Sequence, residues 1–308
     1  MLTATTWPIA AAMLPFGSIT PTGEPIHDAP AELWADHLKQ VSDVGFTEVD
    51  PTDTWVRVGD LSPTRLDEFK GALGDAGLTI PAISTSRRSV IDATRGEDYL
   101  AYGHRLIDVA PSLGASVVSF GFFQELTPAQ QKALWFWLAP SYKDPDDPEI
   151  WQLAVSRIRE LGEHAKQVGI QISLEMYEDT YVGTCDDAIR FVEDVNCDAV
   201  GLNPDIGNFI RLHRPIEPVQ QMFDKVLPHA NFWHVKNYSR DEDPTTGTIT
   251  TYPMEMAQGL INYRRVIRQA LALGFSGPFL CEHYGSDGLG VCGRNREYIQ
   301  GVLRSALA

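Results

Sequence analysis

The sequence predicts an α/β fold, a single (β/α)8 TIM barrel that spans residues 1–308 as one domain. Three observations favour this fold. Eight short apolar runs alternate with segments of helical periodicity, which is the pattern of a parallel sheet covered by helices. The 308 residues exceed the roughly 250 of a typical barrel, so we expect loop insertions. No G-x-G-x-x-G follows the first run, which disfavours the alternative, an open doubly wound sheet.

The predicted strands are short, apolar and bounded by turn residues. In chain order they cover residues 6–16, 47–51, 78–85, 115–123, 170–177, 198–205, 230–238 and 277–285. Strands separated by helices pair in parallel, and eight such units close most economically into a barrel. We therefore expect the carboxyl ends of all eight strands to meet at one mouth.

Helical segments with recognisable ends lie between most of these runs. Ser62 and Pro63 are a typical N-cap and first helical residue, and Gly77 and Gly114 are typical of the residue that follows a helix. The predicted helices run from about residue 31 to 44, from 63 to 77, from 96 to 113, from 150 to 168, from about 184, from 215–218, after 259, and from about 294 to 306.

Two long insertions interrupt this pattern, residues 124–149 after the fourth strand and 239–259 after the seventh. Loops of this length are usually functional or ordered by a partner. The first contains the aromatic loop LWFWLAPSY (134–142), with the rings of Trp135, Phe136, Trp137 and Tyr142. These rings could stack on a flat face of a ligand, dock a partner subunit, or pack as core under the loop. Trp137 is included among the expected substrate contacts.

The composition excludes several kinds of partner. The net charge is −16 and the pI is near 4.8, so the chain lacks the basic surface that nucleic acids and anionic membranes attract. A small, neutral or metal-chelated substrate fits better. No apolar stretch approaches the roughly 20 residues that span a bilayer. The four cysteines have no C-x-x-C spacing and no signal peptide precedes the first strand, so we expect reduced thiols in a soluble cytoplasmic protein.

Four polar residues stand at or near the ends of the last four predicted strands: Glu175, Asp205, His234 and Glu282. Taken singly, each has an ordinary explanation, such as a helix cap, a turn or a hydrogen-bonded structural histidine. In four successive β/α units, however, they would meet at the barrel mouth. This oxygen-rich set suits Mn²⁺, Mg²⁺, Co²⁺ or Zn²⁺ and leaves positions open for a substrate.

The residues around this set resemble the sugar isomerase and epimerase family built on the xylose-isomerase-like barrel. The resemblance is carried by LEMYEDTYVGT (174–184), VGLNPDIGNF (200–209), WHVKNYSR (233–240) and FLCEHYG (279–285). The D-x-G-N and H-x-K patterns among them are fairly specific. The resemblance implies one divalent metal, Mn²⁺ first, with Mg²⁺, Co²⁺ or Zn²⁺ as alternatives, and the ligands would be Glu175, Asp205, His234 and Glu282.

The resemblance also implies roles for other residues. Glu175 and Glu282 would serve as the proton-transfer pair. Arg240, six residues after the metal-binding histidine, and Lys236 of the H-x-K pattern would contact the substrate, with a solvated surface charge as the alternative for each.

The chain also departs from the family pattern. Asn208 replaces the histidine of the D-x-x-H that ketose epimerases and zinc endonucleases carry; it can hydrogen-bond a sugar hydroxyl but cannot act as an acid or base. Histidines that a multinuclear zinc site needs on strands three and four are also missing from the sequence. Together with the negative charge, this argues against DNA repair.

The leading hypothesis is a metal-dependent enzyme that isomerises or epimerises a keto sugar or polyol. A proton beside a carbonyl is weakly acidic, and a chelated divalent cation stabilises the enediolate that forms when the proton leaves. One alternative is β-elimination from 3-keto O- or C-glycosides, which relatives of this barrel perform; a small second subunit is then expected. Another alternative is a non-catalytic sugar- or inositol-binding barrel. The identity of the sugar or glycoside and the presence of a homo-oligomer stay open.

Overall fold

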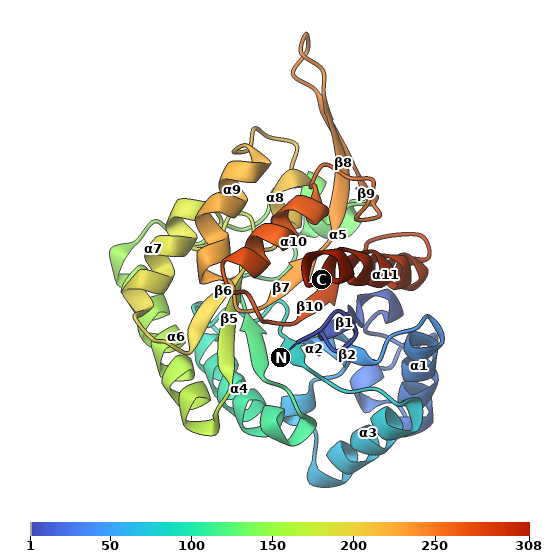
Figure 1. Cartoon of the computed structure of the whole chain (residues 1–308). Helices are drawn as coiled ribbons and strands as arrows, with labels where there is room; N and C mark the ends of the chain where they lie inside the picture. Colours follow the sequence, from blue (N-terminus) through green and yellow to red (C-terminus); the bar gives the residue numbers. More distant parts are fainter. Residues whose placement is uncertain (1) are drawn as a thin grey trace.

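Eight parallel strands form a closed barrel with helices around its outside in the computed structural model, which describes residues 2–308 (Figure 1). Each predicted run contains one barrel strand. The barrel strands are β1 (Ile9–Ala12), β2 (Glu48–Asp50), β3 (Ala82–Ser84), β4 (Val117–Phe120), β5 (Gln171–Glu175), β6 (Val200–Asn203), β7 (Trp233–Val235) and β10 (Phe279–Cys281).

The strands pair in two sets of four, ordered β2-β1-β10-β7 and β3-β4-β5-β6. Single parallel bridges, Glu48 with Thr79 and Leu202 with Ala230, join the two sets and close the barrel. The predicted parallel (β/α)8 topology is therefore confirmed. Closure brings the carboxyl ends of the strands to one mouth, as expected for this fold.

The helices follow the predicted spacing. The longer ones are α1 (Ala31–Asp43), α3 (Pro63–Ala76), α4 (Gly96–Val109), α6 (Pro148–Val168), α7 (Cys185–Val195), α9 (Val219–Val226), α10 (Tyr263–Ala272) and α11 (Gly288–Ala306). Single turns of α-helix lie at α2 (Thr52–Trp55), α5 (Pro128–Lys132) and α8 (Gly207–Ile210), and turns of 3₁₀-helix lie at Leu14–Phe16, Ile26–Asp28, Val58–Asp60, Ala110–Leu113, Phe136–Leu138 and Leu227–His229.

Capping residues set several of these boundaries. The side chain of Ser62 accepts a hydrogen bond from the backbone of Arg65 at the start of α3, and Gly77 ends that helix with a positive φ of 67°. The last helix begins six residues earlier than the predicted Arg294. Asp287 caps it by accepting from the Gly290 backbone at 2.9 Å, and the glycines of its first turns had obscured the helical pattern.

The seventh predicted run contains more than a barrel strand. Its last residues begin β8 (Asn237–Glu242), which pairs antiparallel with β9 (Ile249–Met254). The two form a hairpin that projects away from the barrel (Figure 1). The sequence pattern predicts an insertion here but not its strands.

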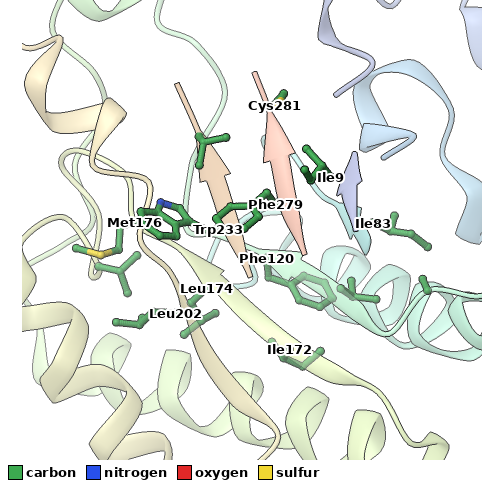
Figure 2. Close-up of a cluster of buried hydrophobic side chains, with 14 of the residues drawn as sticks. Ile9, Ile83, Phe120, Ile172, Leu174, Met176, Leu202, Trp233, Phe279 and Cys281 are labelled. Atoms are coloured by element: carbon green, nitrogen blue, oxygen red, sulfur yellow. The ribbon is translucent and has the colours of Figure 1, made fainter. Parts of the chain in front are cut away.

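Side chains alternate between the two faces of the barrel wall. Figure 2 shows part of the larger apolar cluster, which includes Ile172 and Leu174 on β5 and packs between the strands and the helices. A smaller cluster fills the barrel interior with Ala10, Ala12, Ala82, Val117, Phe232 and Leu280. One step further along the strands the inward positions turn polar, and this change marks the mouth.

Two further predictions concern the whole chain. The four cysteines are all buried and form no disulfide among themselves. Among residues 2–308, no helix has the length and apolar character needed to cross a membrane.

Candidate metal centre

The four predicted ligands lie together on the inner face of the mouth. Glu175 is the last residue of β5, His234 lies within β7, and Glu282 directly follows β10. Asp205 stands two residues beyond the end of β6. None of the four is more than 8 % exposed. Burial of this many charged groups is costly unless they are compensated, so the cluster requires positive charge.

The imidazole of His234 stands among the three carboxylates. Its Nδ1 atom lies 3.4 Å from Oε2 of Glu175, 3.9 Å from Oδ2 of Asp205 and 3.1 Å from Oε1 of Glu282. One ligand atom each from Glu175, Asp205 and His234 all lie within 4.8 Å of one another. Four side chains from four successive strands thus converge on a small volume.

The other side of the imidazole is held by a hydroxyl. Nε2 of His234 lies 3.0 Å from Oγ of Ser84, which donates to Oδ2 of Asp50 at 2.7 Å. Because the Ser84 proton is used by Asp50, Ser84 must accept the Nε2 proton of His234. Asp50 is fixed in turn by the backbone N–H groups of Ser84 and Thr52. This chain leaves Nδ1 facing the carboxylates, which is the orientation that a metal ligand needs.

Lys236 provides positive charge inside the cluster. Its Nζ atom donates to Oδ2 of Asp205, and it donates to Oε2 of Glu282 at 2.5 Å. Burial alone would lower the pKa of Lys236, but Asp205 and Glu282 raise it well above its ordinary value. The lysine is therefore charged and buried, and it holds two of the carboxylates in place.

The two glutamates have opposite electrostatic environments. Burial, the largest effect, and the nearby Glu282 raise the pKa of Glu175 to about 7, although His234 and Lys236 act against them. Burial would also raise the pKa of Glu282, but Lys236 and His234 together hold it well below its usual range. Burial lowers the pKa of His234, and Glu282 and Glu175 outweigh it to give about 9. Lys236 and His234 thus compensate the charge of Glu282 more fully than that of Glu175.

The donor set fits a divalent cation. Oδ1 of Asp205 is buried and has no hydrogen-bond partner within residues 2–308, and Nδ1 of His234 makes no hydrogen bond of good geometry there, although Oε1 of Glu282 lies 3.1 Å away. Buried polar atoms are rarely left unsatisfied, so Oδ1 of Asp205 points to a missing partner. Carboxylate oxygens with one imidazole nitrogen suit Mg²⁺, Mn²⁺, Co²⁺ or Zn²⁺.

Asn208, in the short helix α8, lies against the cluster. Its Nδ2 atom donates to Oε1 of Glu175 at 3.1 Å and to the carbonyl of Met176 at 2.9 Å. Its Oδ1 atom is buried and makes no hydrogen bond in the described part of the chain. The amide nitrogen thus orients Glu175, and only the oxygen is free for a ligand.

Arg240, one of the expected substrate contacts, lies outside the cluster. The guanidinium of Arg240 donates to the carbonyls of Ile210, Leu212 and Arg214, and it pairs with Glu242. These contacts tie the projecting hairpin to the loop after β6, and the structure does not bring Arg240 into the cluster.

Trp137 is buried and stacks on Trp135 with ring centroids 5.1 Å apart. It meets Tyr284, two residues after Glu282, with ring centroids 5.4 Å apart. The aromatic loop therefore packs on the wall of the mouth.

A buried ion pair lies under the aromatic loop. Nη2 of Arg211 donates to both carboxylate oxygens of Glu178 at 2.9 Å, and neither side chain is more than 3 % exposed. The guanidinium lies 5.0 Å from the ring centre of Phe136 and 5.1 Å from that of Trp137. Cation–π contacts of this kind fix the loop to the barrel.

A small cavity of about 40 Å³, partly open to solvent, lies beside the cluster. Glu175, His234 and Glu282 line one part of it. The wall also includes Thr52, Ser84, Arg87, Phe123, Tyr177 and Tyr284. A wall that combines aromatic rings with hydroxyl and charged groups suits a small, oxygen-rich ligand.

Sequence reasoning did not single out Asp50, Ser84 or Arg87. A signal exists for the first two, because Asp50 ends β2 and Ser84 ends β3, in the same strand-end position as Glu175. Arg87 lies on a loop, and no spacing rule places its side chain in the cavity.

Comparisons with known proteins agree with this architecture. A family model described as "Xylose isomerase-like TIM barrel" matches residues 38–305. A xylose isomerase-like TIM barrel protein from Mycobacterium smegmatis, solved in complex with magnesium, is 57 % identical; the alignment covers 100 % of both chains, with a TM-score of 0.97. A search of curated proteins finds no match.

More distant structures share the fold. D-psicose 3-epimerase from Clostridium cellulolyticum H10, solved with D-tagatose, is 14 % identical over 97 % of this chain and 96 % of its own, with a TM-score of 0.63. The 3-keto-D-glucoside 4-epimerase from E. coli is 13 % identical over 96 % of this chain and 99 % of its own, with a TM-score of 0.64.

Proposed function

Because the chain belongs to the xylose isomerase-like TIM barrel family, we propose that it is a metal-dependent enzyme that removes and returns a proton beside the carbonyl of a keto sugar or polyol. The sugar would be isomerised or epimerised. The observation that carries this proposal is the convergence of three buried carboxylates on Nδ1 of one histidine, beside a cavity that two of these carboxylates line.

Glu175, Asp205, His234 and Glu282 would hold one divalent cation. When bound, the cation supplies positive charge that offsets the negative charge developing on the substrate oxygens. We favour Mg²⁺ or Mn²⁺, since oxygen ligands dominate the set and the relative from Mycobacterium smegmatis was solved with magnesium. Co²⁺ and Zn²⁺ remain alternatives of the same donor set.

Glu175 and Glu282 are the proposed proton carriers. Both line the cavity, so both can reach a carbon held there. Asn208 orients the Glu175 carboxylate by donating to its Oε1 atom. The lowered pKa of Glu282 keeps that carboxylate ionised, and Lys236 fixes its orientation.

The remaining contacts prepare the site. Ser84 and Asp50 hold the ring of His234, and Asn208 holds Glu175. Groups that are fixed before substrate arrives need no rearrangement during the reaction, which is the main source of electrostatic catalysis. Lys236, Asn208 through its oxygen, Trp137 and Arg240 stay proposed substrate contacts, of which Arg240 would need to leave its present partners.

Deuterium exchange tests the proposal. The Mg²⁺- or Mn²⁺-loaded protein would be incubated with a panel of keto sugars in D₂O, and deuterium at the carbon beside the carbonyl measured by mass spectrometry and NMR. We expect exchange with at least one keto sugar in the wild type and its loss in Glu175→Gln. An exposed variant, Glu193→Gln, is the matched control. Binding without exchange for every sugar would favour the sugar-binding barrel.

A second candidate function follows from the aromatic loop. Phe136 and Trp137 pack on Tyr284, whose ring lines the cavity, so the loop stands where an aromatic leaving group could stack. The same proton removal from a 3-keto O- or C-glycoside would then be followed by β-elimination of the aglycone. Release of a free phenol from a 3-keto aryl glycoside distinguishes this outcome from simple exchange.

A further inference from the structure

We propose that Arg87 is the residue that recognises an oxyanion, either a carboxylate or a phosphate, on the substrate. The inference rests on the proposed function for the position of the reacting end of the sugar. The composition of the chain favours a neutral or metal-chelated substrate, whereas this inference favours an acidic sugar.

Arg87 lines the same cavity as the candidate metal ligands. Its side chain shares that wall with Glu175, His234 and Glu282, and with the hydroxyl-bearing residues Thr52 and Ser86. A small ligand that meets the glutamates at one end can therefore meet a guanidinium at another.

No carboxylate within residues 2–308 lies within 4.0 Å of the Arg87 guanidinium. The neighbouring residue differs, since Arg88 pairs with the buried Asp53. A partly buried arginine is normally paired, and this protein carries a net charge of −16, so carboxylates are abundant. An arginine left without one inside a cavity is a candidate anion receptor.

The guanidinium is nevertheless held in place. Nη2 donates to the hydroxyl of Tyr177 at 2.9 Å and Nη1 donates to the carbonyl of Gln124 at 3.1 Å. The rings of Phe136 and Tyr177 lie 5.3 and 5.2 Å from its central carbon. These partners are all neutral. They fix the position of the Arg87 guanidinium but do not cancel its charge. Three of its five N–H donors are left for a ligand.

The backbone at this wall is strained. Arg87 has a φ of +55° and Thr52 a φ of +40°. Both values lie in the left-handed region, which residues other than Gly, Asn and Asp seldom adopt. Both residues line the cavity. Strain of this kind gathers at ligand sites, where it is kept because it aims a particular side chain.

Calorimetric titration of the Mg²⁺-loaded protein tests the assignment, with 2-keto-gluconate, fructose 6-phosphate and fructose as probes. The main variant is Arg87→Asn, because asparagine tolerates the left-handed backbone. Arg87→Lys keeps the charge but loses the fork of donors. Arg304→Gln, on the exposed side of α11, removes one positive charge far from the cavity and is the matched control.

We expect at least one anionic probe to bind the wild type about tenfold or more tightly than fructose, as one charge-assisted arginine contact allows. Tighter binding of 2-keto-gluconate would identify carboxylate recognition, and tighter binding of fructose 6-phosphate would identify phosphate recognition. Arg87→Asn should lose this preference, Arg87→Lys should keep part of it, and Arg304→Gln should keep it all. Equal binding of anionic and neutral probes to the wild type overturns the assignment, as does a preference that survives in Arg87→Asn.

The same samples separate the two proposals. An anionic preference without deuterium exchange contradicts the proposed reaction and leaves Arg87 as a binding residue. Deuterium exchange on a neutral ketose, without tighter binding of either anionic probe, contradicts the proposed role of Arg87 and supports the proposed reaction. The preference of the wild-type protein gives this result even where a variant does not fold.

Discussion

Nε2 of His234 lies 3.0 Å from the hydroxyl oxygen of Ser84, on the side of the ring that faces away from the carboxylates. Since Ser84 donates its proton to Asp50, the hydroxyl can only accept from the imidazole. The orientation of His234 is thus set by two residues that touch none of the three carboxylates. Residues of this kind govern metal affinity in other proteins almost as strongly as the ligands do.

Replacing Ser84 with alanine should weaken metal binding. The ring of His234 loses the acceptor that fixes it, and the expected loss of affinity for Mg²⁺ is about 10- to 100-fold, measured by calorimetry on the metal-free protein. Ser119 provides a matched control, because it lies opposite Ser84 on the neighbouring strand and its buried hydroxyl has no partner in residues 2–308. Equal losses in Ser84→Ala and Ser119→Ala would show that the contact has no special role.

Lys236→Met should destabilise the metal-free protein. Without the ammonium group, Asp205 and Glu282 keep their buried charges and lose their closest cation, at a cost of about 3 kcal/mol in the free energy of unfolding. Added Mg²⁺ should then restore more stability to the variant than to the wild type, as followed by urea denaturation. Lys39→Met, at an exposed pair on α1, should change little. Identical responses to Mg²⁺ in variant and wild type would contradict this account.

Breaking the pair of Arg211 and Glu178 should loosen the aromatic loop. Glu178→Gln leaves the fully buried guanidinium without its counter-charge, which we expect to cost about 3 to 5 kcal/mol in the free energy of unfolding. Hydrogen exchange of residues 134–142 should also rise. Asp43→Asn breaks an exposed pair and should cost less than about 1 kcal/mol. Unchanged protection of the loop in Glu178→Gln means that the pair does not anchor it.

Asp144 should give the protein a pH-dependent stability. Burial, opposed by hydrogen bonds from the Tyr181 backbone and Gln124, raises the pKa of Asp144 from 3.8 to about 6. Between these values the folded protein holds the proton more tightly than the unfolded chain. The contribution of Asp144 to the free energy of unfolding therefore falls as pH rises through this window and is constant above about 6.

Urea denaturation of wild type and Asp144→Asn, at steps between pH 4 and pH 7, isolates this contribution as the difference between the two curves. The difference in the free energy of unfolding between the two proteins should change as pH rises from 4 to about 6 and stay constant above about 6. A difference that is flat from pH 4 to pH 6 means that Asp144 titrates normally in the folded protein.

Much of this architecture is predictable from the sequence, since strands and helices alternate regularly and caps such as Ser62 are local signals. The four candidate ligands are predictable for the same reason, because strand ends converge in a barrel. The strands of the 237–254 hairpin are not, because apolar and polar residues alternate only weakly along them. The role of Arg87 depends on the conformation of its loop and on the absence of a paired carboxylate, and the spacing of residues in the sequence predicts neither.

Metal binding tests the central claim most directly. Metal-free wild type and Asp205→Asn would be titrated with Mn²⁺ and followed by calorimetry and by the loss of the free-ion electron paramagnetic resonance signal. We expect one ion per chain in the wild type, displaced by Mg²⁺, and a strong loss of affinity in the variant. Wild-type protein that takes up no divalent metal, or a variant that binds it equally well, would contradict the proposal that these four residues form a metal centre.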